Sequence, residues 1–265
     1  MKKTILITGA TDGIGLETAM MLAPLGHTLL LHGRNPDKLA AAAAAVSGID
    51  GAGVIETYRA DLSDLADVVA LADKIKSVHT SLDVLINNAG VFKMRDPVTR
   101  DGYDARFIVN VVAPYQLTKA VLPLIGPEGR VVNLSSAAQA PVNLEAFVTK
   151  QILSDGEAYA QSKLALTMWS AEMANQLGAN GPVIVAVNPA SFLASKMVKE
   201  AYGHDGHDLR IGADILTRAA LSDEFADASG RYYDNDRKAF AQPHPDALDS
   251  AKNKRVVAAL DQLIK

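Results

Sequence analysis

The chain has 265 residues, of which 49% are hydrophobic and 21% are charged, a composition typical of a globular protein that buries a sizeable core. It contains no cysteine, which excludes disulfides and thiolate chemistry and favours a reducing compartment, so we expect a cytoplasmic protein. The net charge of −4 comes without a long basic run, and no apolar run approaches a membrane span, so we expect neither nucleic acid nor a membrane as partner.

Short β-branched runs alternate with longer helical patterns along the first 190 residues. Strands are predicted over 4–8, 28–31, 54–58, 84–86, 130–134 and 183–187. Helices are predicted over 14–25, 36–46, 65–78, 103–122 with a kink at Pro114, and 158–176, and the pattern becomes irregular after Pro189. This alternation predicts one α/β domain over residues 1–265: a Rossmann-type, doubly wound parallel sheet with helices on both faces.

The first predicted strand runs directly into a glycine-rich turn, from which a helix begins. Its glycines follow the spacing Gly-x-x-x-Gly-x-Gly. Glycine lets the backbone approach a phosphate, and the N–H groups at a helix start attract negative charge. We therefore predict a dinucleotide site here rather than a plain tight turn, although Asp12 adds negative charge near the phosphates. The predicted cofactor residues of this turn are Gly9, Thr11, Asp12, Gly13, Ile14 and Gly15.

The second predicted strand ends at Gly33-Arg34, where a site for NAD usually has a carboxylate that binds the ribose hydroxyls. A guanidinium at this position can instead hold a 2′-phosphate through charge-assisted hydrogen bonds. Arg34 therefore favours NADP(H) over NAD(H); the alternative is an ordinary surface arginine at a strand end.

Two further strand ends carry polar groups. Asp61, beside Leu62, follows the third strand, and its carboxylate could accept from the adenine amine, cap the next helix, or do both. Asn87-Asn88-Ala89-Gly90 follows the fourth strand. Its amides could hold neighbouring loops while Ala89 and Gly90 let a flat cofactor approach, although a simple turn also explains the run.

Tyr159 and Lys163 stand four residues apart at the start of an apolar helical pattern, so their side chains share one helix face. A phenol has a pKa near 10, and a neighbouring cation favours the phenolate. The pair is a candidate general acid/base, although the same spacing occurs on many ordinary helices.

In this order, the motifs resemble the classical short-chain dehydrogenase/reductase family from Lys3 to about Met197. The resemblance rests on Gly9, Gly13, Gly15, Asn87 to Gly90, Asn110, Ser136, Tyr159 and Lys163. The run from Ala158 to Ala165 and the late Ser229-Gly230-Arg231-Tyr232-Tyr233 are similar to the retinol dehydrogenase and carbonyl reductase branch.

The resemblance implies a role for each catalytic candidate. Tyr159 would exchange a proton with a carbonyl or alcohol oxygen, and Lys163 would lower the Tyr159 pKa and bind the nicotinamide ribose. Ser136, rather than Ser135, would hydrogen-bond the reacting oxygen. Asn110 would hold a water that connects Lys163 to solvent; the alternative is a helix amide bonded to a nearby backbone group.

The sequence departs from the family pattern in two places. The family usually has Pro-Gly followed by Thr beside the nicotinamide carboxamide, whereas here Ala190 follows Pro189, and Ser191 or Ser195 offers the hydroxyl. Pro189 and Ser191 remain predicted cofactor residues. The stretch 137–157 between Ser136 and Tyr159 is longer than usual; it could wall the substrate pocket, obstruct an oligomer surface, or be a solvated loop.

We therefore expect an NADP-dependent oxidoreductase that acts on a carbonyl or alcohol; the alternative is a catalytically silent NADP(H)-sensing protein, and a sugar-nucleotide epimerase fits the glycine spacing less well. The small-molecule substrate should be apolar or aromatic, under a less regular lid over about 190–212 whose hinges are glycines 203, 206 and 212. A homodimer or homotetramer through the helices that carry Asn110 and Tyr159 is expected, and a metal is not. The apolar residues expected at the pocket are Phe92, Met94, Phe147, Ile152, Phe192, Leu193, Met197, Val198 and Tyr202.

Overall fold

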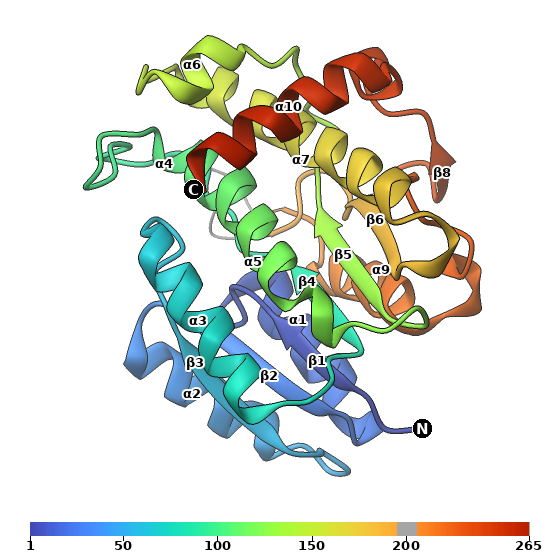
Figure 1. Ribbon diagram of the computed structural model, residues 1–265. Coiled ribbons are helices and arrows are strands. Elements are labelled where there is room, and N and C mark those ends of the chain that lie inside the picture. The colour runs from blue at the N-terminus through green and yellow to red at the C-terminus, as the bar shows by residue number, and fades with distance from the viewer. Residues whose placement is uncertain (195–205, 265) are drawn as a thin grey trace.

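The computed structural model describes residues 1–194 and 206–264, and within them eight strands form one sheet in the order β3-β2-β1-β4-β5-β6-β7-β8 (Figure 1). Every neighbouring pair is parallel except β7 and β8. The predicted Rossmann-type sheet is confirmed. The strands are β1 Thr4–Ile7, β2 Thr28–Gly33, β3 Ile55–Arg59, β4 Val84–Asn87, β5 Arg130–Leu134, β6 Val183–Asn188, β7 Tyr232–Asp234 and β8 Ala239–Ala241.

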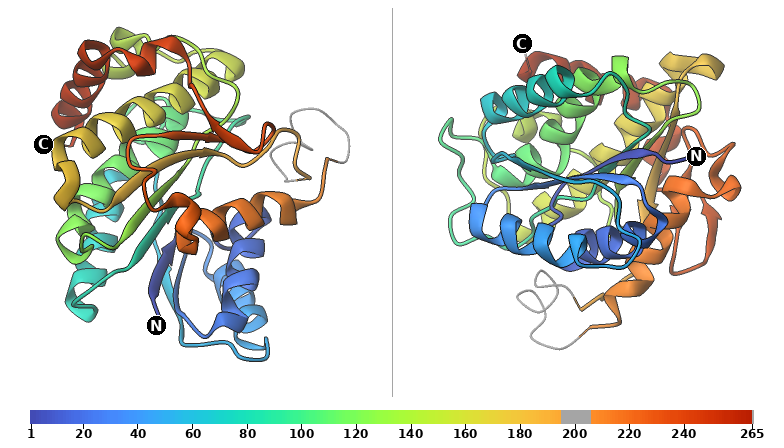
Figure 2. Two further views of the ribbon diagram at one scale, coloured as in Figure 1. Left: turned by 90° about the vertical axis from the view of Figure 1, so that its right-hand side faces the viewer. Right: turned by 90° about the horizontal axis from the view of Figure 1, so that it is seen from below.

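Helices cover both faces of the sheet, as Figures 1 and 2 show. One face carries α1 (Gly13–Leu22), α2 (Pro36–Ser47) and α9 (Leu209–Leu221). The other carries α3 (Leu65–Val78), α5 (Ala113–Val121), α7 (Asp155–Leu177) and α10 (Ser250–Leu263). Short helices are α4 (Ala105–Phe107) and α6 (Leu144–Val148), and 3-10 turns cover Ala23–Leu25, Leu122–Leu124, Gly178–Asn180, Asp223–Phe225 and Pro245–Leu248.

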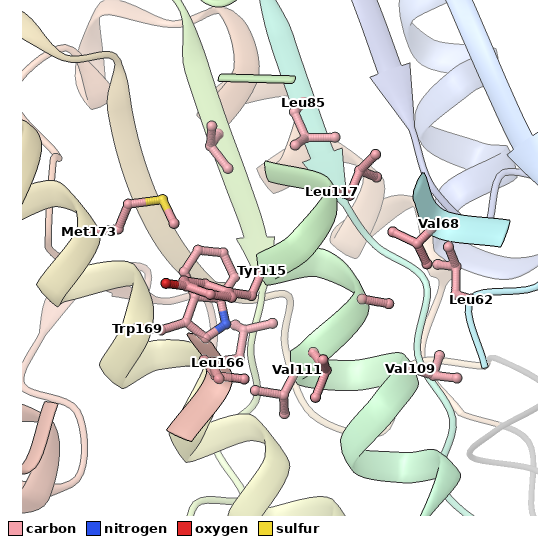
Figure 3. Close-up of a cluster of buried hydrophobic side chains, with 14 of the residues drawn as sticks. Leu62, Val68, Leu85, Val109, Val111, Tyr115, Leu117, Leu166, Trp169 and Met173 are labelled. Atoms are coloured by element: carbon pink, nitrogen blue, oxygen red, sulfur yellow. The ribbon is translucent and has the colours of Figure 1, made fainter. Parts of the chain in front are cut away.

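Two hydrophobic cores result because successive side chains of a strand point to opposite faces. In β1, Ile5 and Ile7 pack beneath α1, α2 and α9, whereas Leu6 packs on the opposite side. Figure 3 shows part of this second core, where Trp169 of α7 meets Tyr115 of α5 edge to face at 5.6 Å. Buried, mainly aliphatic strands of this kind were predictable from sequence, whereas β3, with Glu56, Thr57 and Arg59, is largely polar and only partly buried.

The helical run around Pro114 differs from its predicted form. Instead of one kinked helix from 103, α4 begins at Ala105, a π-helical turn covers Ile108–Val112, and α5 follows. Proline has no N–H to continue the α-helical ladder, and the wider turn precedes it directly. Contrary to expectation, Ala105–Leu124 is long and apolar enough to cross a membrane, but 67% of its most apolar window is buried inside the protein, as in a core helix.

Part of the stretch 137–157 packs against the fold, although many of its residues are exposed. Buried Phe147 of α6 lies 5.0 Å from Phe107, ring to ring. Arg106, also buried, donates to Asp104 at 2.6 Å, to the Leu153 carbonyl at 2.7 Å and to Asp155. The start of α7 is therefore tied to the helix before the π-helical turn.

The chain after Pro189 is more regular than predicted. It contributes α9, β7, β8 and α10. The helices α9 and α10 both begin at aspartate N-caps, Asp208 and Asp249. Helix α10 packs along α7, and its Asp261 accepts hydrogen bonds from Tyr115 at 2.8 Å and Lys119 at 2.6 Å (Figure 1).

Candidate active site

A cavity of about 680 Å³ lies at the carboxyl ends of the parallel strands, around the switch point where β1 and β4 are neighbours. The predicted site residues that line it are Gly9, Thr11, Asp12, Gly13, Ile14, Arg34, Asp61, Leu62, Asn88, Ala89, Gly90, Ser136, Tyr159, Lys163, Pro189 and Ser191. Two predicted residues, Gly15 and Asn110, are outside this lining and act from behind it.

The glycine-rich turn needs its glycines for different reasons. Gly9 and Gly13 have φ angles of 66° and 55°, in the left-handed region that favours glycine. Gly15 has no such angle, but a Cβ there would lie 2.4 Å from both the Gly9 carbonyl oxygen and the Asn88 side-chain nitrogen. Gly15 therefore lets α1 start close beneath the turn. The Asp12 carboxylate caps α1 by accepting from the Gly13 N–H at 2.8 Å.

The loop after β4 is held against this turn, as its amides predicted. The Asn88 side-chain nitrogen donates to the carbonyl oxygens of Thr8 and Gly9 at 2.8 and 3.1 Å. The Thr8 hydroxyl in turn accepts from the backbone N–H groups of Asn88 and Ala89 at 3.0 and 3.1 Å. These bonds join the two loops that flank the switch point, and Thr8 is a contributor that the sequence did not single out.

His32 is a second residue that sequence reasoning missed. Its ring lines the cavity yet is only 3% exposed. The Gly9 N–H donates to Nδ1 at 3.2 Å, so Nε2 carries the proton and donates to the Ala60 carbonyl at 3.1 Å. Burial lowers the pKa of His32 to about 4, against the opposing effects of Ala60 and Asp61. A neutral histidine therefore ties the glycine-rich turn to the end of β3.

Two cations, Arg34 and Lys38, lie at the β2 end of the cavity beside two carboxylates, Asp12 and Asp61. Arg34 lines it together with Lys38, a residue not predicted, whose Nζ lies 3.9 Å from Asp12. Any side chain at position 33 would force Thr11 to move, because a Cβ there would lie 2.3 Å from the Thr11 methyl group.

Asp61 lies at the same end of the cavity but does not cap the following helix, since Asp64 does so. Burial raises the pKa of Asp61, but the hydrogen bonds from Ser63 and the charge of Arg34 outweigh it, so the net shift is downward. Asp61 is therefore an ionised acceptor, as the predicted contact with the adenine amine would require.

Tyr159 and Lys163 meet at the other end of the cavity. They lie on α7, which begins with a capping box between Ser154 and Glu157 just before Tyr159. The Lys163 Nζ lies 5.6 Å from the Tyr159 ring centroid and donates to the Leu134 carbonyl at 2.7 Å. Burial lowers the pKa of Lys163 to about 8, so at neutral pH it is still mostly an ammonium. That charge favours the Tyr159 phenolate.

The two adjacent serines after β5 have different environments. Ser135 is buried, and its hydroxyl shares a 2.7 Å hydrogen bond with Thr167. The Ser136 hydroxyl accepts from the Ala138 N–H at 3.1 Å, which leaves its own proton available to donate. Ser136 is therefore the better candidate to bind a reacting oxygen beside Tyr159.

Asn110 lies within the π-helical turn, behind Gly90. Its side chain accepts from the Val91 N–H at 2.8 Å and donates to the Val91 carbonyl at 2.9 Å and to Ser162 at 3.0 Å. These contacts match the second reading of Asn110, a helix amide that is hydrogen-bonded to nearby backbone groups. A Cβ on Gly90 would lie 3.4 Å from Asn110 Oδ1 and 3.5 Å from Lys163 Nζ, so both polar groups reach the same wall.

The Tyr159 end of the cavity has an aromatic wall. The Phe92 ring lies 4.8 Å from the Tyr159 ring, and Phe192 and Leu193 also line the space. Phe147 was wrongly predicted here, since it is buried against Phe107, and Met94 and Ile152 do not line the cavity either. The remaining predicted lining residues, Met197, Val198 and Tyr202, and residues 195–205 of the expected lid lie outside the described residues.

These features fit a dinucleotide with a 2′-phosphate. The glycine-rich turn and the start of α1 could receive its pyrophosphate, Arg34 and Lys38 its 2′-phosphate, and the walls at Ala89 and Gly90 its flat ring.

Comparison with known proteins agrees with this geometry. The family model described as short chain dehydrogenase matches residues 3–205. Retinol dehydrogenase 13 of Homo sapiens is 29% identical over 99% of this chain and 84% of its own. Among solved structures, an uncharacterised Mycobacterium paratuberculosis protein has a TM-score of 0.82 and 28% identity, covering 99% of this chain and 93% of its own. A Shigella flexneri short chain dehydrogenase complexed with NADP has a TM-score of 0.70 and 28% identity, covering 88% of this chain and 97% of its own.

Proposed function

The chain belongs to the short-chain dehydrogenase family and is an oxidoreductase that resembles the retinol dehydrogenases, and we propose that it uses NADP(H) to interconvert an apolar carbonyl compound and its alcohol. The observation that carries this proposal is one cavity with Arg34 at one end and an acid/base pair, Tyr159 and Lys163, at the other. When bound, the nicotinamide supplies or accepts the hydride.

The protein's own residues orient the substrate and transfer the proton. Ser136 donates a hydrogen bond to the substrate oxygen, where negative charge develops. Tyr159 gives its phenolic proton to that oxygen in reduction and takes it back in oxidation. The buried Lys163 ammonium stabilises the phenolate, and its bond to the Leu134 carbonyl fixes its position.

The preference for NADP(H) rests on the two cations near β2 and on the absence of a carboxylate at positions 33 and 34. NADPH should bind more tightly than NADH. Arg34→Ala should weaken NADPH binding about tenfold or more, since hydrogen bonds to charged groups contribute roughly 1.5–3 kcal/mol, and should leave NADH binding nearly unchanged.

Calorimetric titration of both cofactors into wild type and variant tests this preference. Lys38→Ala is the matched variant. It should lose less NADPH affinity than Arg34→Ala, because the Lys38 ammonium also lies near the Asp12 carboxylate. Equal NADPH and NADH affinities in the wild type would contradict the preference.

The proposed substrate class rests on the Phe92 ring beside Tyr159 and on the apolar residues Val91, Phe192 and Leu193 in the cavity lining. A pocket lined mainly by apolar groups with a few polar ones selects apolar ligands. The name of one relative, retinol dehydrogenase 13, refers to an apolar alcohol and supports the same class. A panel of apolar, aromatic and anionic carbonyl compounds, followed by NADPH absorbance, tests it, and turnover of anionic sugars or acids alone would refute it.

A silent NADP(H) sensor remains the second candidate but is less well supported. Binding alone requires neither a hydroxyl at Ser136 nor a phenol beside a buried ammonium at Lys163. The cytoplasmic location stays a prediction, as does the homodimer or homotetramer. A dimer through the outer faces of α5 and α7 would have to displace α10, which packs there.

A further inference from the structure

The turn between β7 and β8 holds the loop that follows β6. The Asp236 carboxylate accepts from the Ser191 N–H at 2.8 Å, from the Ser191 hydroxyl at 2.7 Å and from the Asn188 amide at 2.9 Å. Beside it, the buried Asn235 amide donates to the Pro189 carbonyl at 3.0 Å. Every residue from 188 to 191 except Ala190 is thus bound by side chains more than 40 positions later in the chain.

The exception, Ala190, has a φ of 106°, a conformation that side chains other than hydrogen rarely adopt. Such a residue persists only where its surroundings hold it, and here its two chain neighbours are both fixed by the β7–β8 turn. Ala190 would prefer a negative φ, and adopting one would move this loop. By holding Ser191, Asp236 keeps Ala190 in its unfavourable conformation.

The position of the loop gives this contact a functional meaning. Loop 188–191 follows β6, which pairs with β5, and it lines the cavity at the same end as Ser136 and Tyr159. Arg34 and Lys38 lie beyond β1, near β2. A dinucleotide with its phosphates at the turn after β1 and its adenosine toward β2 has to place its nicotinamide half toward β5 and β6.

We propose that Asp236 is a positioning residue for the nicotinamide half of the cofactor, acting through the strained loop 188–191. The inference rests on the proposed use of NADP(H). It assigns a role to a carboxylate that is itself outside the cavity lining, and it predicts that the adenosine half binds independently of Asp236.

The test compares two probes, NADPH and adenosine 2′,5′-bisphosphate, which lacks the nicotinamide half, by calorimetric titration. Asp236→Asn keeps the side-chain size but replaces one acceptor oxygen with a donor that faces other donors. We expect NADPH affinity to fall about tenfold and that of adenosine 2′,5′-bisphosphate to stay within twofold. Asp227→Asn, a change of an exposed carboxylate before β7, is the matched control and should alter neither affinity.

A second variant separates positioning from general damage. Glycine tolerates a φ of 106°, so adding Ala190→Gly to Asp236→Asn should restore a substantial part of the NADPH affinity. Parallel weakening of both probes, no weakening of NADPH, or no restoration by Ala190→Gly would overturn the inference. Wild-type protein that binds neither probe would instead refute the proposed function, and this inference with it.

Discussion

His32 should make the stability of the fold fall as the pH drops below 6.5. Its pKa is about 4 in the folded protein, whereas an exposed histidine has a pKa near 6.5. Because the folded value is the lower one, the unfolded chain binds the proton first as the pH falls, and stability is lost between pH 6.5 and 4. Linkage with these two values gives a loss of about 2 kcal/mol between pH 7 and pH 5.

The measurement is urea unfolding of wild type and His32→Gln at pH 7, 6 and 5. Glutamine can still accept from Gly9 and donate to Ala60 but does not titrate. All other titrating groups are shared, so their contributions cancel in the comparison. The wild type should lose about 2 kcal/mol more than the variant on going from pH 7 to pH 5. Equal losses of unfolding free energy in wild type and variant would show that His32 is not held neutral by its bonds to Gly9 and Ala60.

Two further substitutions probe the supports of the site. Gly15→Ala should cost about 2 kcal/mol or more in urea unfolding, because its Cβ meets the Gly9 backbone at 2.4 Å, and wild-type stability would refute that close approach. Arg106→Leu should cost roughly 3–5 kcal/mol, because it leaves the Asp104 carboxylate, whose side chain is 1% exposed, without its partner. A loss below about 1 kcal/mol, the scale of a surface pair, would contradict the buried ion pair.

Features that depend on local patterns could be predicted from the sequence. Five of the first six strands are short, largely apolar runs, β3 being the more polar exception, and their alternation with helices identified the parallel sheet and its carboxyl edge. Tyr159 and Lys163 lie one helical turn apart, so their meeting needed no tertiary information. The glycine spacing located the start of α1 within one residue.

Features that depend on contacts between distant residues could not be predicted in this way. His32 looks like any strand residue until Gly9 and Ala60 converge on its ring, and Asp236 is 45 positions from Ser191. In helix α10 a polar run, Lys252 to Arg255, is followed by an apolar run, Val256 to Leu260, and its position follows from packing on α7, although the Asp249 cap was a readable signal. The Ser154 capping box likewise marked the true start of α7.

The most direct test of the proposed function is turnover by Tyr159→Phe. Phenylalanine keeps the ring that packs beside Phe92 and removes only the hydroxyl. With the best apolar carbonyl substrate, kcat should fall by roughly 10²–10⁴, since that is the usual contribution of a positioned general acid, while the Kd for NADPH stays within about twofold. Undiminished turnover by Tyr159→Phe would remove Tyr159 from the mechanism and contradict the account.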